Sequence, residues 1–203
     1  MKIDDVHVYD MNESILASGF PKSIALEPTV STSYLVEKDF KRADKLSSAP
    51  IGSGHDCFLK GIVCAFNVTA SQNWWLQFGR YKFANIVSST SKMHTLVEKL
   101  ATKGNACYDA FVDEAIMKRM GELVEEYINA KDKEEKDSLF LKLAYSCPMG
   151  YLLTARVSTN YLQLKTIYAQ RKNHKLPEWI KFTKFIGSLP HSDWIYGTKG
   201  TTK

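Results

Sequence analysis

The feature that most constrains the fold is a mostly apolar run, FLKGIVCAFNVTA, which begins at Phe58. Its length and its β-branched residues are typical of a buried strand. Ser71 follows the run directly and is the predicted N-cap of a helix. This helix carries aromatic residues at mixed three- and four-residue spacings, which places them on a broad core-facing stripe: Trp74, Trp75, Phe78 and Phe83. The run therefore predicts a buried strand followed by an amphipathic helix.

The remaining patterns alternate between strand and helix. IDDVHVYDM, near the N-terminus, alternates like an edge strand, and YLLTARVS is strand-like. The clearest helix spans residues 111–128, because its apolar side chains repeat at helical spacing. Other predicted helices are DSLFLKLAYS, capped by Asp137 or Ser138, then TNYLQLKTIYAQ, and LPEWIKFTKFIGSL with Pro177 in its first turn. This order predicts an α+β fold with a central sheet flanked by helices.

Length and composition favour one globular domain over residues 1–203. A chain of 203 residues is an ordinary size for a single domain, and no linker-like break is visible. No apolar run approaches the roughly 20 residues that a membrane helix needs, and the N-terminal segment is too acidic and interrupted for a signal peptide. We therefore expect a cytoplasmic protein with no membrane contact.

The net charge of +5 is unevenly distributed along the chain. Residues 161–203 hold eight cations against two acidic residues, which gives +6 and leaves −1 for the rest. An anionic partner, nucleic acid included, would meet this basic segment, but a solvated helix face explains the excess equally well. A duplex-binding role would be better supported by a larger excess and a recognisable module.

Motifs of the common enzyme classes are absent from the sequence. It contains no phosphate-binding loop, dinucleotide fingerprint, zinc-protease motif or nucleophile elbow. Its five histidines have no metal-ligand spacing, so no metal site is predicted. Its four cysteines form no C-x-x-C pair, which argues against a zinc site or a disulfide framework: Cys57, Cys64, Cys107 and Cys147. We interpret them as reduced packing residues, with a catalytic nucleophile as the alternative.

Residues 77–92 resemble the signature of the flavin-dependent thymidylate synthases. That signature is R-H-R-x-x-S-x-N-E-x-S-x-R, preceded by a Q-x-x-R whose arginine opens it. The same frame here reads QFGRYKFANIVSSTSK without a gap. Upstream, Gly54-His55-Asp56 stands where the family has G-H-E, and downstream ARVSTNYLQLK at residues 155–165 is similar to the family's A-R-x-x-x-N-x-L-x-L-R.

The resemblance implies the family's α+β fold and a site for deoxyuridylate and FAD. Positions that correspond to nucleotide-binding residues are Gln77, Arg80, Thr90, Lys92, Arg156 and Lys165. Of these, two are implied to be catalytic: Arg80 and Lys165. Positions that correspond to cofactor-binding residues are His55, Arg80, Tyr81, Lys82, Asn160 and His174. Independently of the family, cations, hydroxyls and amides are the groups that a nucleoside monophosphate needs for its phosphate and its base.

In this family reduced flavin passes a hydride while methylene-tetrahydrofolate donates the carbon, and the members form tetramers. The resemblance thus implies FAD and methylene-tetrahydrofolate as cofactors, a nucleotide as ligand and a homo-oligomer, in the form of a homotetramer. A short, lysine-rich relative of this type would suit a phage or a bacterium.

The chain also departs from the signature. The signature histidine is Tyr81, its second arginine is Lys82, and its Asn-Glu pair is Val87-Ser88. The last arginine of the downstream block is Lys165, which cannot make the same bidentate fork. These departures put catalysis in question.

Three functions therefore stay open at this point. The first is a divergent synthase, or a relative that alters another pyrimidine nucleotide. The second is a non-catalytic member of the fold that acts as a nucleotide sensor or as a protein- or nucleic-acid-binding module. The third is an unrelated function on a similar topology.

Overall fold

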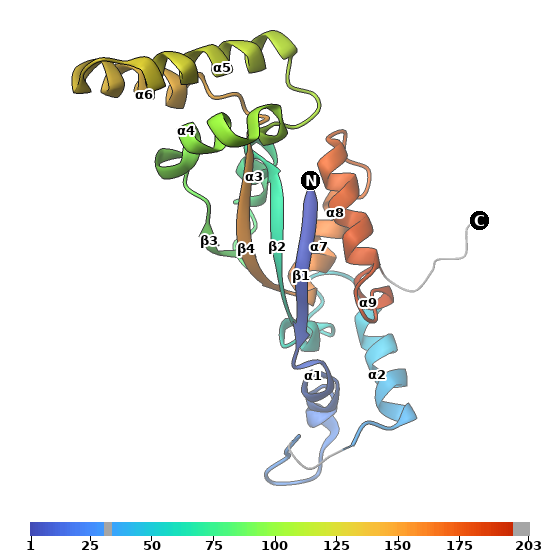
Figure 1. Ribbon diagram of the computed structural model, residues 1–203. Coiled ribbons are helices and arrows are strands. Elements are labelled where there is room, and N and C mark those ends of the chain that lie inside the picture. The colour runs from blue at the N-terminus through green and yellow to red at the C-terminus, as the bar shows by residue number, and fades with distance from the viewer. Residues whose placement is uncertain (31–33, 197–203) are drawn as a thin grey trace. The chain divides into compact units, whose positions relative to one another are not determined.

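The structure is a computed structural model that describes residues 1–30 and 34–196. Within these ranges the chain forms a four-stranded antiparallel sheet with helices around it (Figure 1). The strand order is β1-β2-β4-β3. The strands are β1 (Lys2–Tyr9), β2 (Val63–Ser71), β3 (Asn85–Ser89) and β4 (Leu152–Asn160). The predicted α+β class with a central sheet is confirmed.

The helices of the described ranges precede, separate and follow these strands. They are α1 (Met11–Ala17), α2 (Glu37–Ser47), α3 (Gln72–Phe78), α4 (Lys92–Lys103), α5 (Glu114–Asn129), α6 (Lys133–Ser146), α7 (Tyr161–Arg171), α8 (Pro177–Gly187) and α9 (Asp193–Tyr196). Short 3-10 helices are η1 (Phe20–Lys22), η2 (Cys57–Lys60) and η3 (Gly104–Cys107). Within these ranges, no helix is both long enough and apolar enough to cross a membrane.

The apolar run that begins at Phe58 is only partly a strand. Phe58 lies in η2, and β2 begins at Val63, from where its residues alternate between buried and half-buried. Ser71 caps α3 as predicted, because its hydroxyl accepts a hydrogen bond from the backbone N–H of Trp74. The helix stops at Phe78, however, so Phe83 is not part of a core-facing stripe and is 70% exposed.

The predicted cap of α6 is wrong. The helix begins at Lys133, and the side chain of Asp132 accepts the backbone N–H of Glu135 at 2.9 Å. An aspartate followed by acidic residues in the first turn suits the positive end of the helix dipole. Asp137 and Ser138 therefore lie inside the helix rather than at its start.

Strands β2 and β4 pair in one antiparallel register. The Thr69 and Thr154 hydroxyls lie 2.8 Å apart, and Arg156 donates a hydrogen bond to the Asn67 side chain at 3.3 Å. Beyond the end of β2, the backbone N–H of Gln72 donates to the Tyr151 carbonyl. A single register along the strand pair keeps one face of each strand toward the core.

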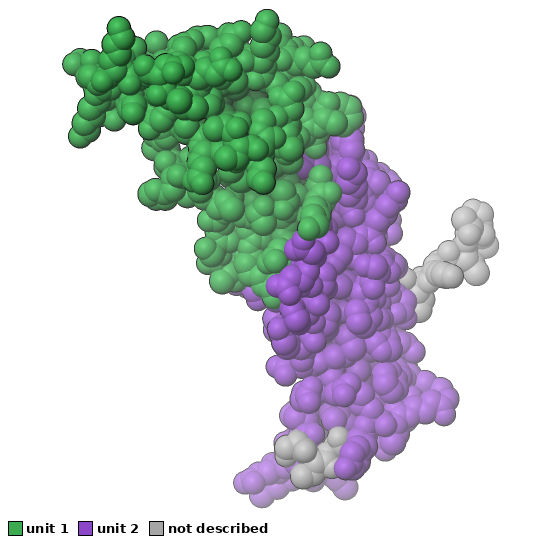
Figure 2. Space-filling view, viewed as in Figure 1, with its two compact units in different colours: residues 1–2, 67–80, 86–156 green, residues 3–66, 81–85, 157–203 purple. Residues whose placement is uncertain are grey.

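The chain divides into two compact units, which Figure 2 distinguishes by colour. The first unit comprises residues 1–2, 67–80 and 86–156, and the second comprises residues 3–66, 81–85 and 157–203. Strands β2 and β4 contribute residues to both units. The expectation of a single domain over residues 1–203 stays a prediction.

Each unit has its own buried apolar side chains. In the first unit they come from α4, α5, α6 and the segments next to these helices: Leu96, Leu100, Cys107, Tyr108, Met120, Leu123, Val124, Leu139, Leu143 and Tyr151. In the second unit α7 packs against α8, α9 and η2. Its largest fully buried side chains are Trp179, Trp194, Tyr161, Phe66, Phe182, Ile15, Leu59 and Ile62.

The cap of α6 yields a stability prediction. Asp132→Ala removes the side-chain acceptor of the first turn and is expected to lower the free energy of unfolding by about 1 kcal/mol. Asp137→Ala is the matched control, since it removes the same carboxylate from the helix interior. Urea unfolding of both variants measures the difference. A larger loss for Asp137→Ala than for Asp132→Ala would contradict the placement of this cap.

Candidate functional site

Lys165 lies in the middle of α7, where it is only 6% exposed. Its ammonium donates to the Ser47 carbonyl at 2.7 Å, to the Ala49 carbonyl at 2.8 Å and to the Asp56 carboxylate at 2.6 Å. A lysine ammonium has three N–H donors, so each donor has an acceptor inside the second unit.

This ion pair joins two of the three sequence blocks that carry the resemblance. Asp56 is the acidic residue of Gly54-His55-Asp56 and is 1% exposed, and Lys165 ends the block of residues 155–165. Two charges removed from water are tolerated when they neutralise each other and satisfy their hydrogen bonds. Contact between Lys165 and a pyrimidine stays a prediction, and it would require opening of this ion pair.

Tyr81, at the position of the signature histidine, is buried against the end of α7. Its hydroxyl accepts a hydrogen bond from Arg171 Nε at 2.7 Å and donates to Gln170 Oε1 at 3.0 Å. The Arg171 guanidinium also lies 4.7 Å from the centre of the Trp179 ring, a cation–π contact. Tyr81 thus contributes to the packing of the second unit, and a role in cofactor binding stays a prediction.

His174 lies just after α7, beside the same aromatic cluster. Its Nδ1 accepts the backbone N–H of Leu176 at 3.0 Å, and its ring meets Trp179 edge to face. Burial and the neighbouring Arg171 charge lower the pKa of His174 below the usual histidine value. The imidazole is therefore neutral at physiological pH, a form suited to hydrogen bonding rather than to binding a phosphate by charge.

A cavity of ≈ 380 Å³ lies at the start of α7, in the second unit. It is lined by Lys60, Phe83, Asn160, Leu162, Gln163 and Thr166. The Asn160 side chain caps α7 by accepting the backbone N–H of Gln163. Gln163 is 8% exposed, and among the described residues its amide atoms are not buried polar atoms that lack a partner. The cavity therefore offers an exposed aromatic ring, an accessible amide and a cation.

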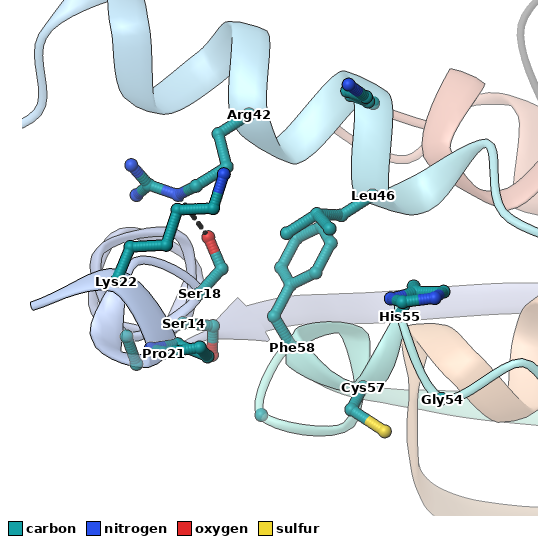
Figure 3. Close-up of a pocket in the computed structure, with 13 residues that line it drawn as sticks. Ser14, Ser18, Pro21, Lys22, Arg42, Leu46, Gly54, His55, Cys57 and Phe58 are labelled. Carbon is teal, nitrogen blue, oxygen red and sulfur yellow. Dashed lines mark hydrogen bonds between the residues drawn. The ribbon is translucent and has the colours of Figure 1, made fainter.

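The other two cofactor positions of the second unit are exposed. His55 lines a cavity of ≈ 580 Å³ in that unit, next to Cys57 and Phe58 (Figure 3). Lys82 is exposed, and within residues 1–30 and 34–196 its ammonium makes no ion pair. Both side chains are accessible to a ligand.

Five of the predicted nucleotide-binding residues lie in the first unit, and Thr90, Lys92 and Arg156 are among those with hydrogen-bond partners there. The backbone N–H of Thr90 donates to the Thr154 carbonyl at 2.8 Å, and the Thr90 hydroxyl accepts the Thr154 N–H. Lys92 Nζ donates to the Ala144 carbonyl at 3.0 Å. Arg156 is held by Asn67. These side chains are oriented by the protein itself.

Gln77 and Arg80 lie at and beyond the end of α3. Gln77 is half-buried, whereas the Arg80 guanidinium is exposed and has no ion pair or hydrogen bond among the described residues. An exposed arginine without an internal acceptor keeps its full capacity for a phosphate or a carbonyl. Arg80 is therefore the accessible cation of the predicted nucleotide set in the first unit.

A catalytic cysteine is not favoured by the environment of the thiols. Burial raises the pKa of Cys147 to about 11, and it raises the pKa of Cys107 above its usual value. Cys64 is fully buried and only Cys57 is exposed. Raised thiol pKa values keep these groups protonated at neutral pH. The described residues also hold no group of three potential metal ligands.

Sequence reasoning assigned no role to several residues that shape these sites. Asp56 was part of a quoted block, but its partner lies 109 positions away. Arg171 and Gln163 carried no signal, because an arginine near a helix end and a glutamine inside a helix usually face solvent. Only the packing of α7 shows that Arg171 contacts Tyr81 and that Gln163 lines a cavity.

No protein-family model matches this chain, and comparison with curated protein sequences gives no match. The structure is similar to two crystal structures of the flavin-dependent thymidylate synthase ThyX from Helicobacter pylori, each with FAD and dUMP. The TM-scores are 0.69 and 0.66, and the sequence identities are 15% and 16%. Each comparison covers 96% of this chain and 96% of the other.

The chain therefore has the fold of the flavin-dependent thymidylate synthases. The three sequence blocks predicted this fold, and the resemblance is confirmed at that level. Identity this low shows the fold alone, so the roles of the individual site residues stay predictions.

The buried ion pair yields a second stability prediction. Lys165→Met leaves the Asp56 carboxylate buried without its cation and is expected to cost about 3–5 kcal/mol of unfolding free energy. Lys172→Met, at the exposed end of the same helix, is the control and is expected to change stability little. Urea unfolding measures both. A loss below about 1 kcal/mol for Lys165→Met would show that this pair does not hold the second unit together.

Proposed function

We propose that the protein binds a pyrimidine deoxynucleoside monophosphate such as dUMP together with FAD, as a divergent flavin-dependent thymidylate synthase-like protein. The observation that carries this proposal is the match in fold to ThyX structures with FAD and dUMP over nearly the whole of both chains. The sequence blocks support it independently, since they supply polar and cationic residues at the corresponding positions.

In this proposal the first unit provides the nucleotide-binding side chains. Arg80 is exposed and unpaired among the described residues, so it is the first candidate for the phosphate or the base. The hydroxyl and cations of Thr90, Lys92 and Arg156 are already oriented by neighbouring groups. Gln77 adds an amide, which can donate to and accept from a pyrimidine edge. Such pre-oriented groups lose little entropy when a ligand binds.

In the same proposal the second unit provides cofactor-binding side chains. The cavity at the start of α7 suits a planar heteroaromatic ring, because Phe83 offers a face for stacking and the Gln163 amide can donate and accept hydrogen bonds. Asn160 stands at its edge, and His55, Lys82, Tyr81 and His174 complete the proposed set. FAD would supply hydride chemistry when bound.

Catalysis by this chain rests on fewer groups than in the family. Arg80 would stabilise negative charge that develops on the pyrimidine, the usual protein contribution to such a reaction. Lys165 would add a second positive charge only after release from Asp56. In the enzymatic form of the proposal, methylene-tetrahydrofolate is the carbon donor.

A second candidate function is a non-catalytic nucleotide sensor or binding module of the same fold. It is favoured by Lys165 and Tyr81, since both engage internal partners at positions implied to meet ligands. By resemblance, both forms of the proposal include a homotetramer in the cytoplasm. The basic segment after Tyr161 leaves a nucleic-acid partner as a weaker alternative.

Retention of flavin tests the cofactor part of the proposal. The purified protein is incubated with FAD, freed of unbound flavin and measured by visible absorption. We expect a flavin band in the native protein and at least about a tenfold weaker affinity for FAD in Gln163→Leu, which removes the amide that lines the cavity. The control is Lys181→Leu, which changes an exposed residue of α8. Gln170→Leu is not used, because Gln170 contacts Tyr81. Absence of the band in the native protein would remove FAD from the proposal.

Calorimetric titration with dUMP tests the nucleotide part. Arg80→Ala is expected to weaken binding by about tenfold or more, the usual loss for a charge-assisted hydrogen bond. Arg119→Ala, also in the first unit, is the control, since Arg119 pairs only with Glu122 and Glu126 on the surface of α5. Equal affinity of Arg80→Ala and the native protein for dUMP would show that Arg80 does not bind the nucleotide.

A further inference from the structure

A cavity of ≈ 580 Å³ in the second unit lies between α1, α2 and the segment that leads through η2. Figure 3 shows its labelled residues: Ser14, Ser18 and Pro21 on one side, Arg42 and Leu46 on α2, and Phe58 between them. This volume falls within the range of about 300–1,000 Å³ that is typical of small-molecule sites. Only one of the three sequence blocks contributes to this cavity, through Gly54 and His55.

The walls of the cavity are mainly apolar. Ala17, Pro21, Leu46 and Phe58 line it, and the Phe58 ring lies beside Leu46 in the view of Figure 3. Phe58 is half-buried, and its ring packs edge to face on Trp194. An aromatic ring fixed from behind offers a face or an edge for another flat apolar group.

Every charged group that lines this cavity is a cation. Lys22, Arg42 and Lys45 contribute the charges, and among the described residues no acidic side chain lines it. Lys22 and Lys45 are exposed and form no ion pair in the described ranges. Unpaired cations at the edge of an apolar cavity attract an anion and leave its apolar part to the walls.

Arg42 has a different role from the two lysines. Its guanidinium donates to the Asp39 carboxylate at 2.8 Å, to the Ser18 hydroxyl at 2.9 Å and to the Ile15 carbonyl at 2.9 Å. These bonds tie α2 to α1 and keep the two walls of the cavity in place. The arginine is therefore a positioning residue, and the free positive charge comes from Lys22 and Lys45.

Ser14 adds a polar group to the cavity. It is 8% exposed, and among the described residues its hydroxyl is not one of the buried polar atoms that lack a partner. A Cβ at Gly61 would contact this hydroxyl, so the glycine leaves room for it. An accessible hydroxyl can donate a hydrogen bond to a ligand or accept one from it.

We propose that this cavity is a binding site for a small aromatic anion, a flat ring system that carries a phosphate or a carboxylate. Its ring packs against Phe58, Leu46 and Pro21, its anionic group lies at Lys22 and Lys45, and the Ser14 hydroxyl meets a polar atom. Neither lysine belongs to the sequence blocks, and the proposed ligand is distinct from dUMP and from FAD. His55 of the proposed flavin set also lines the cavity, so competition with FAD is part of the test.

Calorimetric titration of the full chain with 1-naphthyl phosphate tests the proposal. We expect 1-naphthyl phosphate and 1-naphthoate to bind. The neutral 1-naphthalenemethanol should bind at least about tenfold more weakly than 1-naphthyl phosphate, and inorganic phosphate alone should not bind measurably. Equal affinity for the neutral compound, or no binding of 1-naphthyl phosphate, would overturn the proposal.

Paired charge reversals locate the binding. Lys22→Glu with Lys45→Glu is expected to weaken the binding of 1-naphthyl phosphate by about tenfold or more, because it replaces two cations with two anions. Both residues are exposed, so the fold does not depend on their charge. Lys181→Glu with Lys184→Glu makes the same charge change on α8 and is the control. Ala17→Trp fills the cavity and is expected to abolish binding, with thermal unfolding to confirm that it folds. Unchanged affinity in the Lys22/Lys45 variant would overturn the assignment.

A further titration identifies the source of the ligand. If prior saturation with FAD blocks 1-naphthyl phosphate, the cavity belongs to the flavin site and the proposal is overturned. If both bind together, the cavity serves a separate aromatic anion.

Discussion

The ion pair between Lys165 and Asp56 is the interaction on which the second unit depends. It binds the middle of α7 to the segment after α2, through one carboxylate and the two carbonyls of Ser47 and Ala49. Burial of two charges is costly, and the cost is offset only because each ammonium proton has an acceptor. Asp56 lies next to His55, a residue that lines the cavity between α1, α2 and η2.

Helix α7 extends this role from one residue to the whole unit. Its start is capped by Asn160 and borders the cavity of Phe83 and Gln163, and its end holds Tyr81 through Arg171. Positions that the family resemblance links to ligands are thus also positions that hold this unit together. A shared fold therefore does not decide whether this chain binds the ligands or catalyses the reaction of the family.

The predictions from sequence succeeded where side chains obey a local pattern and failed where they do not. The strand before Ser71, the Ser71 cap and the helix that begins at Pro177 follow from apolar periodicity and capping chemistry. Helix α2 was missed because the residues it buries are small or polar, and β3 was missed because all five of its residues are exposed. The candidate site was predicted only as a set of residue types at positions that correspond to the family's signature blocks.

The fold class, the order of the main elements and the residue types of the proposed nucleotide-binding set follow from the sequence, because these depend on local propensity and on spacing along the chain. Which of those residues are accessible depends on the tertiary structure. Arg80 is exposed while Lys165 is engaged by Asp56, a partner 109 positions away. Packing brings distant residues together, and a buried charge needs its partner wherever the chain supplies it. For the same reason, the cavity of Lys22, Lys45 and Phe58 emerged only when α1, α2 and η2 were seen together.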